Sequence, residues 1–361
     1  MSQKIYTSCE EHLTTSKFGR ELLVDYERIP GRSETFIVES SLEFKGKNSK
    51  GVNNLIFKYI PNKEEAEKIT LFNETSKKRD SSLPAIITDE KLEINTKKGK
   101  MYLVVEEKIE KDEVTEPLRT PLEINMYIDK HINILKTFSN EISEVVSKQG
   151  MQAYKYFDHK NKSRVLDALT DSFGKYIFNQ NTINVLMEIS NKYGFHNTTA
   201  VIHGNYHEKN RIETDKEQII DIKGAGIGPE SLDLAALIST IEHDDFKKKL
   251  DNNMLLSAPM LTTNVQKYFD IDPKDKTTTI TQYVKFLETA TWYNAVFAGI
   301  YRTEDRKRLP EFANRVNFFA KKLKECGYYN EFGQTNKKFS PEKTYNQMFK
   351  VEEQIPMRKA A

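Results

Sequence analysis

The sequence predicts an α+β protein with two lobes, a small antiparallel β-rich N-terminal lobe and a larger, mostly helical C-terminal lobe. With 361 residues, the chain exceeds the size at which one hydrophobic core usually stops growing. Runs rich in β-branched and aromatic residues are concentrated before residue 107, and helical periodicity prevails after it. We therefore expect lobes at residues 1–105 and 106–361, with a hinge at about residues 104–108.

The N-terminal lobe contains four runs that predict strands of an antiparallel sheet. They are Leu22–Glu27, Thr35–Glu39, Asn54–Ile60 and Met101–Val105. Pro30-Gly31 separates the first two runs, and the polar residues 45–53 provide a hairpin loop between the second and the third. Residues 63–78 have the composition of a helix with apolar side chains near one face. One helix is therefore expected between the third and fourth strands.

The C-terminal lobe begins with a clear helix signal. Thr120 can cap a helix, Pro121 suits its first turn, and Glu123 can complete a capping box. Further helices are expected at Ser163–Asn179, Thr182–Tyr193, Leu232–Ile241, Thr279–Tyr301 and Leu309–Cys326. Pro259 predicts a loop, and a polar tail occupies about residues 330–361.

Composition narrows the classes of partner. The 55 Lys and Arg residues nearly balance the 53 Asp and Glu residues, so the net charge gives no reason to expect a nucleic-acid partner. Cys9 and Cys326 lack the spacing of metal ligands, which fits a reducing compartment. No apolar run approaches the ~18 residues of a membrane span, and the first residues contain no signal-peptide core. Composition therefore predicts a cytoplasmic protein with no membrane partner.

Two consecutive segments have the layout of a phosphoryl-transfer site. The first contains His203, Asn205 and Asn210 at the spacing of kinase-like catalytic loops, but an amide stands at position 205 where such loops carry a carboxylate. The second has Asp221 at the end of a short apolar run, where a carboxylate can reach a hard divalent cation. Asp233 follows 12 residues later (233 − 221 = 12) and is expected either to cap a helix or to hold the catalytic loop through backbone amides.

Together these segments resemble the aminoglycoside phosphotransferase and choline kinase-like superfamily. Its members carry His-Gly-Asp-x-x-x-x-Asn, and this chain also reproduces their later frame as Ile220-Asp221, Gly228-Pro229 and Asp233-Leu234-Ala235. The resemblance implies a bilobal protein kinase-like fold, ATP or GTP as the donor, Mg²⁺ as cofactor and a small hydroxylated acceptor. It assigns metal binding to Asn210 and Asp221, the position of the catalytic base to Asn205, and a bracing role within the loop to His203.

The same resemblance extends into the N-terminal lobe. Lys58 is the expected strand lysine, and Glu74 is its expected partner because the separation (74 − 58 = 16) leaves room for a loop and two helical turns, with Glu67 as the second candidate. The resemblance places the hinge that meets the adenine edge at Val105, Glu106 and Glu107. In the loop expected over the phosphates, Ser33 and backbone amides are the available donors.

Asn205 leaves three interpretations of the activity. Its amide oxygen can accept a hydrogen bond, but the amide has negligible basicity. The chain is therefore an Asp→Asn variant made from an active kinase, a natural pseudokinase that binds nucleotide and regulates a partner, or an active enzyme with a relocated base. An impaired small-molecule phosphotransferase is the leading hypothesis, and the pseudokinase is the alternative. An RNA-directed kinase, a third hypothesis, requires a basic stripe on the surface.

The same loop contains two further polar residues, His207 and Glu208. His207 is interpreted as an exposed polar residue, and so is Glu208. Glu208 is also the second candidate for a carboxylate near the acceptor.

Overall fold

A computed structural model describes most of the chain. The described residues are 5–29, 34–45, 51–78, 81–88, 92–109, 120–153, 159–170, 178–192, 200–207, 210–212, 218–239, 241, 257–304 and 307–350. The chain divides into two compact units. Unit 1 comprises Met1–Val114, Thr137–Gly150 and Lys209–Ala225, and unit 2 comprises Thr115–Lys136, Met151–Glu208 and Gly226–Ala361. The lobes expected from the sequence are continuous, whereas each unit is assembled from separate segments.

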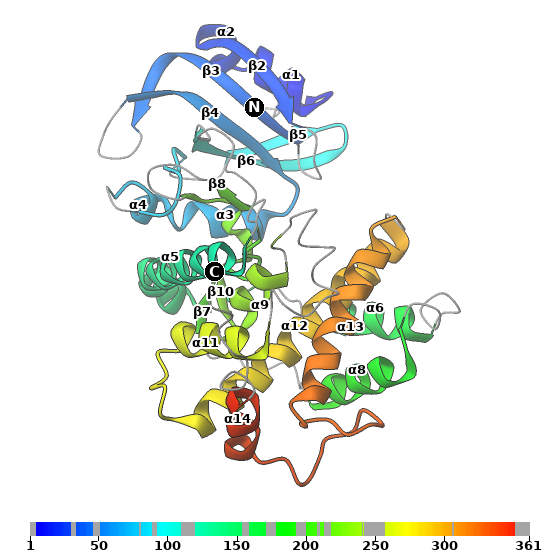
Figure 1. Cartoon of the computed structure of the whole chain (residues 1–361). Coiled ribbons are helices and arrows are strands. Elements are labelled where there is room, and N and C mark those ends of the chain that lie inside the picture. The colour runs from blue at the N-terminus through cyan, green and yellow to red at the C-terminus, as the bar shows by residue number, and fades with distance from the viewer. Residues whose placement is uncertain are drawn as a thin grey trace. The chain divides into compact units, whose positions relative to one another are not determined.

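A six-stranded sheet dominates unit 1 (Figure 1). Its order is β1-β5-β6-β4-β3-β2, and all neighbours are antiparallel except β1 and β5. The strands are β1 (Ile5–Tyr6), β2 (Leu23–Ile29), β3 (Glu34–Lys45), β4 (Gly51–Ile60), β5 (Leu92–Thr96) and β6 (Gly99–Glu107). The four strand predictions are confirmed. The sequence did not reveal β1 and β5 because both are short and mix polar with apolar residues.

The two faces of strand β4 have different surroundings. Leu55, Phe57 and Tyr59 alternate along the strand and are buried in one apolar core with helix α1 (Cys9–Thr15). Because successive side chains of a strand point to opposite faces, Lys58 points away from this core. Lys58 therefore lies on the face of β4 opposite to this core, where it can contact other groups.

The helix expected at residues 63–78 is split into α3 (Lys63–Thr70) and α4 (Asn73–Ser76). Phe72 lies between them, fully buried, with φ −88° and ψ 4°. The side chain of Asn73 then donates to the carbonyl oxygens of Ile86 and Thr88, both at 2.9 Å. The prediction of one uninterrupted helix is wrong because burial of Phe72 and these long-range hydrogen bonds fix a turn there.

Most of the helices belong to unit 2, while α5 contributes residues to both units. The capping box before α5 is confirmed: the Thr120 N–H donates to Glu123 Oε2 (2.8 Å), and the Glu123 N–H donates to Thr120 Oγ1 (3.2 Å). The helix α12 contacts six other described helices, namely α6, α8, α9, α11, α13 and α14. The bounds are α5 (Pro121–Gln149), α6 (His159–Thr170), α8 (Gln180–Lys192), α9 (Leu232–Ser239), α11 (Ala258–Tyr268), α12 (Lys276–Glu304), α13 (Leu309–Glu325) and α14 (Pro341–Lys350).

One expectation about the C-terminal region needs correction. Pro259 does not mark a loop but lies in the first turn of α11, where the missing N–H costs no helical hydrogen bond, and Ser257 caps that helix. Part of the polar tail forms α14, which contacts α12 and α11, whereas residues 351–361 lie outside the described residues. Among the described helices, none combines the length and apolar character needed to cross a membrane.

Candidate functional site

The loop with His203 and Asn205 follows strand β7 (Ala200–Ile202) in unit 2. This strand pairs antiparallel with β10 (Gly226–Gly228). A Cβ at Gly226 would lie 2.4 Å from backbone atoms of Gln152 and Ala153, so only glycine allows this approach. The Ile227 N–H donates to the Met151 carbonyl oxygen at 2.7 Å, which fixes the strand from its other side. The loop therefore starts from a rigid two-stranded base.

Asp233 holds the backbone of this loop. It lies in the first turn of α9 and is fully buried. Its Oδ2 accepts the His203 N–H (2.6 Å) and its Oδ1 accepts the Gly204 N–H (2.8 Å). Burial raises the pKa of Asp233 to about 7, against the lowering effect of these two N–H groups. Of the two roles expected for Asp233, the structure has the one in which it holds the loop.

Tyr206 extends the loop into the interior. Its side chain is fully buried, and its hydroxyl lies 2.8 Å from Nδ1 of His131 in α5. Its ring also meets the His203 ring edge-on, with 5.9 Å between the centroids. Nδ1 of His203 in turn accepts the Asn205 N–H at 3.3 Å, which is the bracing contact expected of His203. Sequence reasoning missed Tyr206 and His131 because no local pattern links residues 75 positions apart.

Asn205 and His207 lie on either side of Tyr206, and both are half-buried. Asn205 Nδ2 lies 3.4 Å from His207 Nε2. The His207 N–H also donates to the carbonyl oxygen of Asn205 at 3.0 Å, forming a tight turn. The interpretation of His207 as merely an exposed residue is therefore wrong, because its ring contacts the residue at the base position. Glu208 lies outside the described residues.

A hairpin in unit 1 brings Asn210 and Asp221 together. It consists of β8 (Arg211–Ile212) and β9 (Gln218–Ile219), with Arg211 opposite Ile219. The Ile220 N–H donates to the Asn210 carbonyl oxygen at 2.9 Å, so the pairing continues to the end where Asn210 and Asp221 stand. The backbone pairing thus places two residues that are 11 positions apart (221 − 210 = 11) at the same end of the hairpin. The sequence had predicted only the short strand before Asp221.

Asp221 adopts a conformation that is uncommon for a side-chain-bearing residue. Its φ and ψ are 60° and 47°, in the left-handed region, where non-glycine residues cluster at functional sites. Its side chain is 34% exposed, and Oδ1 lies 3.5 Å from Lys223 Nζ. A carboxylate and an amide side chain are oxygen donors of the kind that Mg²⁺ prefers. The metal role of Asn210 and Asp221 stays a prediction.

Lys58 has a different partner from the expected one. Its Nζ lies 2.6 Å from Oε2 of Glu106 on β6, and the Glu106 side chain is 8% exposed. Glu74 is exposed on α4, and Glu67 pairs with Lys63 at 3.8 Å within α3. The expected pairing with Glu74 is corrected because β4 and β6 are adjacent strands, with Lys58 opposite Val104, two residues from Glu106 on the same face.

The backbone groups at the expected hinge are paired within unit 1. The Val105 N–H donates to Thr88 Oγ1 (3.3 Å), and the Val105 carbonyl oxygen accepts the Ile87 N–H (2.8 Å). The Glu107 N–H donates to the Ala85 carbonyl oxygen (2.8 Å). These groups are therefore hydrogen-bonded to residues 85–88, and their assignment to the hinge stays a prediction. Ser33, the expected phosphate donor, lies outside the described residues.

A carboxylate on α5 positions the strand that leads to Asp221. Glu141 accepts the N–H (2.9 Å) and the hydroxyl (2.8 Å) of Ser82, and it also accepts the hydroxyl of Ser81. The Ser82 carbonyl oxygen then accepts the Ile219 N–H on β9 at 2.7 Å. Glu141 therefore acts on the hairpin through Ser82. The sequence offers no signal for it beyond a glutamate on an amphipathic helix.

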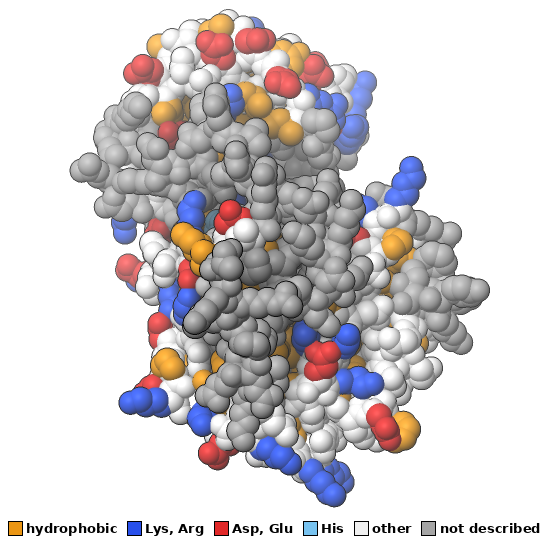
Figure 2. All heavy atoms as spheres, viewed as in Figure 1, with side chains coloured by type: hydrophobic (Ala, Val, Ile, Leu, Met, Phe, Trp, Pro, Cys, Tyr) orange, Lys and Arg blue, Asp and Glu red, His pale blue; other side chains and the backbone are white. Residues whose placement is uncertain are grey.

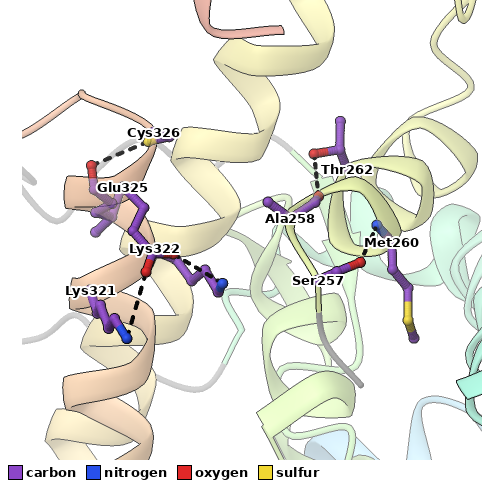
Figure 3. A network of polar contacts seen from close by, with 9 residues as sticks. Ser257, Ala258, Met260, Thr262, Lys321, Lys322, Glu325 and Cys326 are labelled. Carbon is purple, nitrogen blue, oxygen red and sulfur yellow. Dashed lines mark hydrogen bonds and ion pairs between the residues drawn. The ribbon is translucent and has the colours of Figure 1, made fainter. Parts of the chain in front are cut away.

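The described part of unit 2 also contains an open cavity of about 610 Å³ between α8 and α13. Asparagine and lysine side chains dominate its lining, including Asn181, Asn314 and Lys321, and none of the predicted site residues lies in it. Glu325 pairs with Lys321 at 3.7 Å and with Lys322 at 3.0 Å (Figure 3), so its carboxylate offsets part of the positive charge of the lysines. The cavity is therefore separate from the loop at residues 203–207.

Comparisons of the whole fold identify its relatives among solved structures. An ethanolamine kinase from Plasmodium vivax superimposes with a TM-score of 0.52 at 12% identity, covering 86% of this chain and 86% of that one. The GDP complex of an aminoglycoside 2'-phosphotransferase gives 0.53 at 12% identity, covering 86% and 97%. The AMP complex of spectinomycin phosphotransferase gives 0.51 at 14% identity, covering 88% and 98%. The sequence itself matches no protein-family model and no curated protein.

The chain shares the fold of these kinases and phosphotransferases. The bilobal, kinase-like α+β architecture predicted from the sequence is thereby confirmed. Within this kinase-like fold, unit 1 brings together Lys58 with Glu106 and Asn210 with Asp221. Unit 2 brings together His203, Asn205 and Asp233.

Proposed function

We propose that this chain is a Mg-nucleotide-dependent phosphotransferase that moves the γ-phosphoryl group of ATP or GTP to a hydroxyl of a small molecule. The proposal rests mainly on the β8–β9 hairpin, whose backbone pairing places Asn210 and Asp221 at one end, with Asp221 in the left-handed region. Two solved structures with this fold hold GDP and AMP, which supports a nucleotide as the donor.

The residues of unit 1 have distinct tasks in this proposal. Asn210 and Asp221 would hold Mg²⁺, which supplies positive charge to the phosphates during transfer. Lys58 is the candidate for the donor phosphates, and its ion pair with Glu106 at 2.6 Å keeps the ammonium in a fixed position on β4. Catalysis of phosphoryl transfer depends mainly on such positioning and charge stabilisation.

Asn205 limits the second half of the reaction, the removal of the acceptor proton. Its amide oxygen can orient a hydroxyl, but it cannot accept the proton. General-base catalysis contributes on the order of 10²–10⁴-fold, so a chain that lacks any base is expected to be slower by this factor. Asp233 nevertheless holds the backbone of the loop in place. This supports a site in which only proton acceptance is impaired.

A small hydroxylated molecule is the acceptor that we favour. The solved structures with TM-scores above 0.5 include an ethanolamine kinase and phosphotransferases for aminoglycosides and spectinomycin. On the face shown in Figure 2, the described basic side chains form no continuous stripe, which does not favour an RNA-directed kinase. Cys9 and Cys326 are buried free thiols, which supports a reducing cytoplasm as its location.

A second candidate function is a nucleotide-binding pseudokinase that regulates a partner. The one observation in its favour is the amide at position 205. Both candidates require binding of Mg-nucleotide, so binding does not separate them.

Restoring the carboxylate separates the two candidates. The Asn205→Asp variant should phosphorylate at least one of ethanolamine, choline, kanamycin and spectinomycin, measured by ADP release and by mass spectrometry of the product. A restored variant that binds Mg-ATP in calorimetry but transfers phosphate to none of a broad panel of amino alcohols, sugars and aminoglycosides would favour the pseudokinase.

A further inference from the structure

Burial alternates at the end of the loop at residues 203–207. Tyr206 is fully buried and reaches His131, while its neighbours Asn205 and His207 are half-buried. The hydrogen bond from the His207 N–H to the Asn205 carbonyl oxygen (3.0 Å) holds this turn. The imidazole of His207 is therefore fixed beside the amide at the base position, with 3.4 Å between Nε2 and Nδ2.

We propose that His207 accepts the proton of the acceptor hydroxyl in this chain, while Asn205 orients that hydroxyl. This inference rests on the proposed function and assigns to a second residue the task that Asn205 cannot perform. It makes the natural chain an active phosphotransferase with a relocated base.

The chemistry of the pair suits this division of roles. A neutral imidazole is a competent proton acceptor near neutral pH, because its ordinary pKa is about 6.5. Nε2 of His207 faces Asn205 Nδ2 at 3.4 Å, and it can accept a proton in the tautomer that carries the ring hydrogen on Nδ1. A contact of 3.4 Å exceeds the usual N–H hydrogen-bond range, so a bound hydroxyl can replace it with a shorter bond.

The proposed step transfers the γ-phosphoryl group to the acceptor oxygen and conserves atoms and charge. The acceptor oxygen forms a bond to the γ-phosphorus as the bond from that phosphorus to the β,γ-bridging oxygen breaks. The nucleoside diphosphate leaves with the electron pair of the broken bond. The hydroxyl proton moves to His207 Nε2, and the resulting imidazolium later releases it to water.

Other described histidines near the loop are poorly suited to the role. His203 is fully buried, and its Nδ1 already accepts the Asn205 N–H. His131 is fully buried under Tyr206. The described ionisable groups on the loop and its anchor are His203, Tyr206, His207, His131 and Asp233. Among them, only His207 combines partial exposure with contact to the Asn205 side chain.

The test compares His207→Gln in two backgrounds of the full chain. The probes are Mg-ATP with whichever of ethanolamine, choline, kanamycin or spectinomycin the Asn205→Asp variant phosphorylates fastest, and Mg-ATP with water as the acceptor. In the natural background, His207→Gln should lower kcat by about 10²-fold or more, with the Kd for Mg-ATP unchanged. In the Asn205→Asp background the same change should lower kcat by less than about 5-fold, because the carboxylate then accepts the proton.

Two further measurements separate proton acceptance from a structural role. Imidazole in the buffer should restore activity to His207→Ala but not to Asp221→Ala. The acidic limb of the kcat profile should disappear in His207→Gln, and it is assessed as a difference from the natural chain because the pKa of Asp233 lies near 7.

Equal kcat values and equal pH profiles for the natural chain and His207→Gln, when Asn205→Asp transfers phosphate, would overturn this inference alone. A His207→Gln chain that loses its thermal unfolding transition would point to a structural role and would also count against it, unless imidazole rescues His207→Ala. If no variant transfers phosphate, including Asn205→Asp, the proposed function fails and the inference falls with it.

Discussion

The β8–β9 hairpin and the loop at residues 203–207 are close in sequence but are held by different kinds of bond. Backbone pairing fixes the hairpin and leaves Asp221 with 34% of its side chain exposed. Buried polar side chains fix the loop, above all Asp233, which is fully inaccessible to solvent. Side chains at the end of the hairpin can therefore change without loss of the fold, whereas the loop depends on a few buried groups.

Asp233→Asn should have the largest effect on stability. An amide can accept only one of the two N–H groups, and its own NH₂ would face the other, so we expect a loss of about 3 kcal/mol. Denaturant unfolding measures this loss. Ser231→Ala is the matched control, because it removes a hydrogen bond to Thr289 beside the same helix and should cost only about 1 kcal/mol. Equal losses for both variants would show that the Asp233 carboxylate contributes no more to stability than an ordinary buried hydrogen bond.

Asp221→Gly should show the opposite behaviour. Glycine adopts a φ of 60° without strain, so the free energy of unfolding should change by less than about 1 kcal/mol. The Kd for Mg-ATP should rise about 100-fold, equivalent to about 2.7 kcal/mol, because a metal ligand is lost. Calorimetry with and without Mg²⁺ measures the change. Lys223→Ala, which removes only the neighbouring ammonium, is the control, and an unchanged affinity in Asp221→Gly would exclude Asp221 from the metal site.

Two glutamates of unit 1 test which partner Lys58 has. Glu106→Gln weakens a buried, charged hydrogen bond and should destabilise the chain by about 1–2 kcal/mol and weaken Mg-ATP binding. Glu74→Gln should change neither quantity, because Glu74 is exposed on α4. Thermal unfolding and calorimetry on both variants decide the matter. A larger effect at Glu74 would restore the pairing expected from the sequence.

The smallest expected effect is a pH dependence of stability. Because burial raises the pKa of Asp233 from 3.8 to about 7, the folded chain binds a proton more tightly than the unfolded chain does. This contribution to stability is complete below about pH 4 and is lost as pH rises through about 7. Between pH 6 and pH 7 the stability of the natural chain should fall by about 1 kcal/mol relative to Asp233→Asn. Parallel curves for the two proteins would indicate that Asp233 is already ionised at pH 6.

The sequence predicted the parts of the site that depend on local pattern. The run before Asp221 indicated a short strand, and the spacing from Asp221 to Asp233 indicated the frame of the fold. It could not predict the partner of Lys58, because Glu106 lies 48 residues away and is brought near only by the pairing of β4 with β6. The contact of His131 with Tyr206 likewise spans 75 residues and follows no helical or strand period.

The backbone contacts of Asn205 have an evolutionary consequence. Its N–H is held by His203 and its carbonyl oxygen by the His207 N–H, so neither contact depends on the side chain at this position. An exchange between aspartate and asparagine requires a single base change in the codon. A lineage can therefore alter the strength of the base while the loop keeps its shape, and a descendant can reverse the change without first rebuilding the protein.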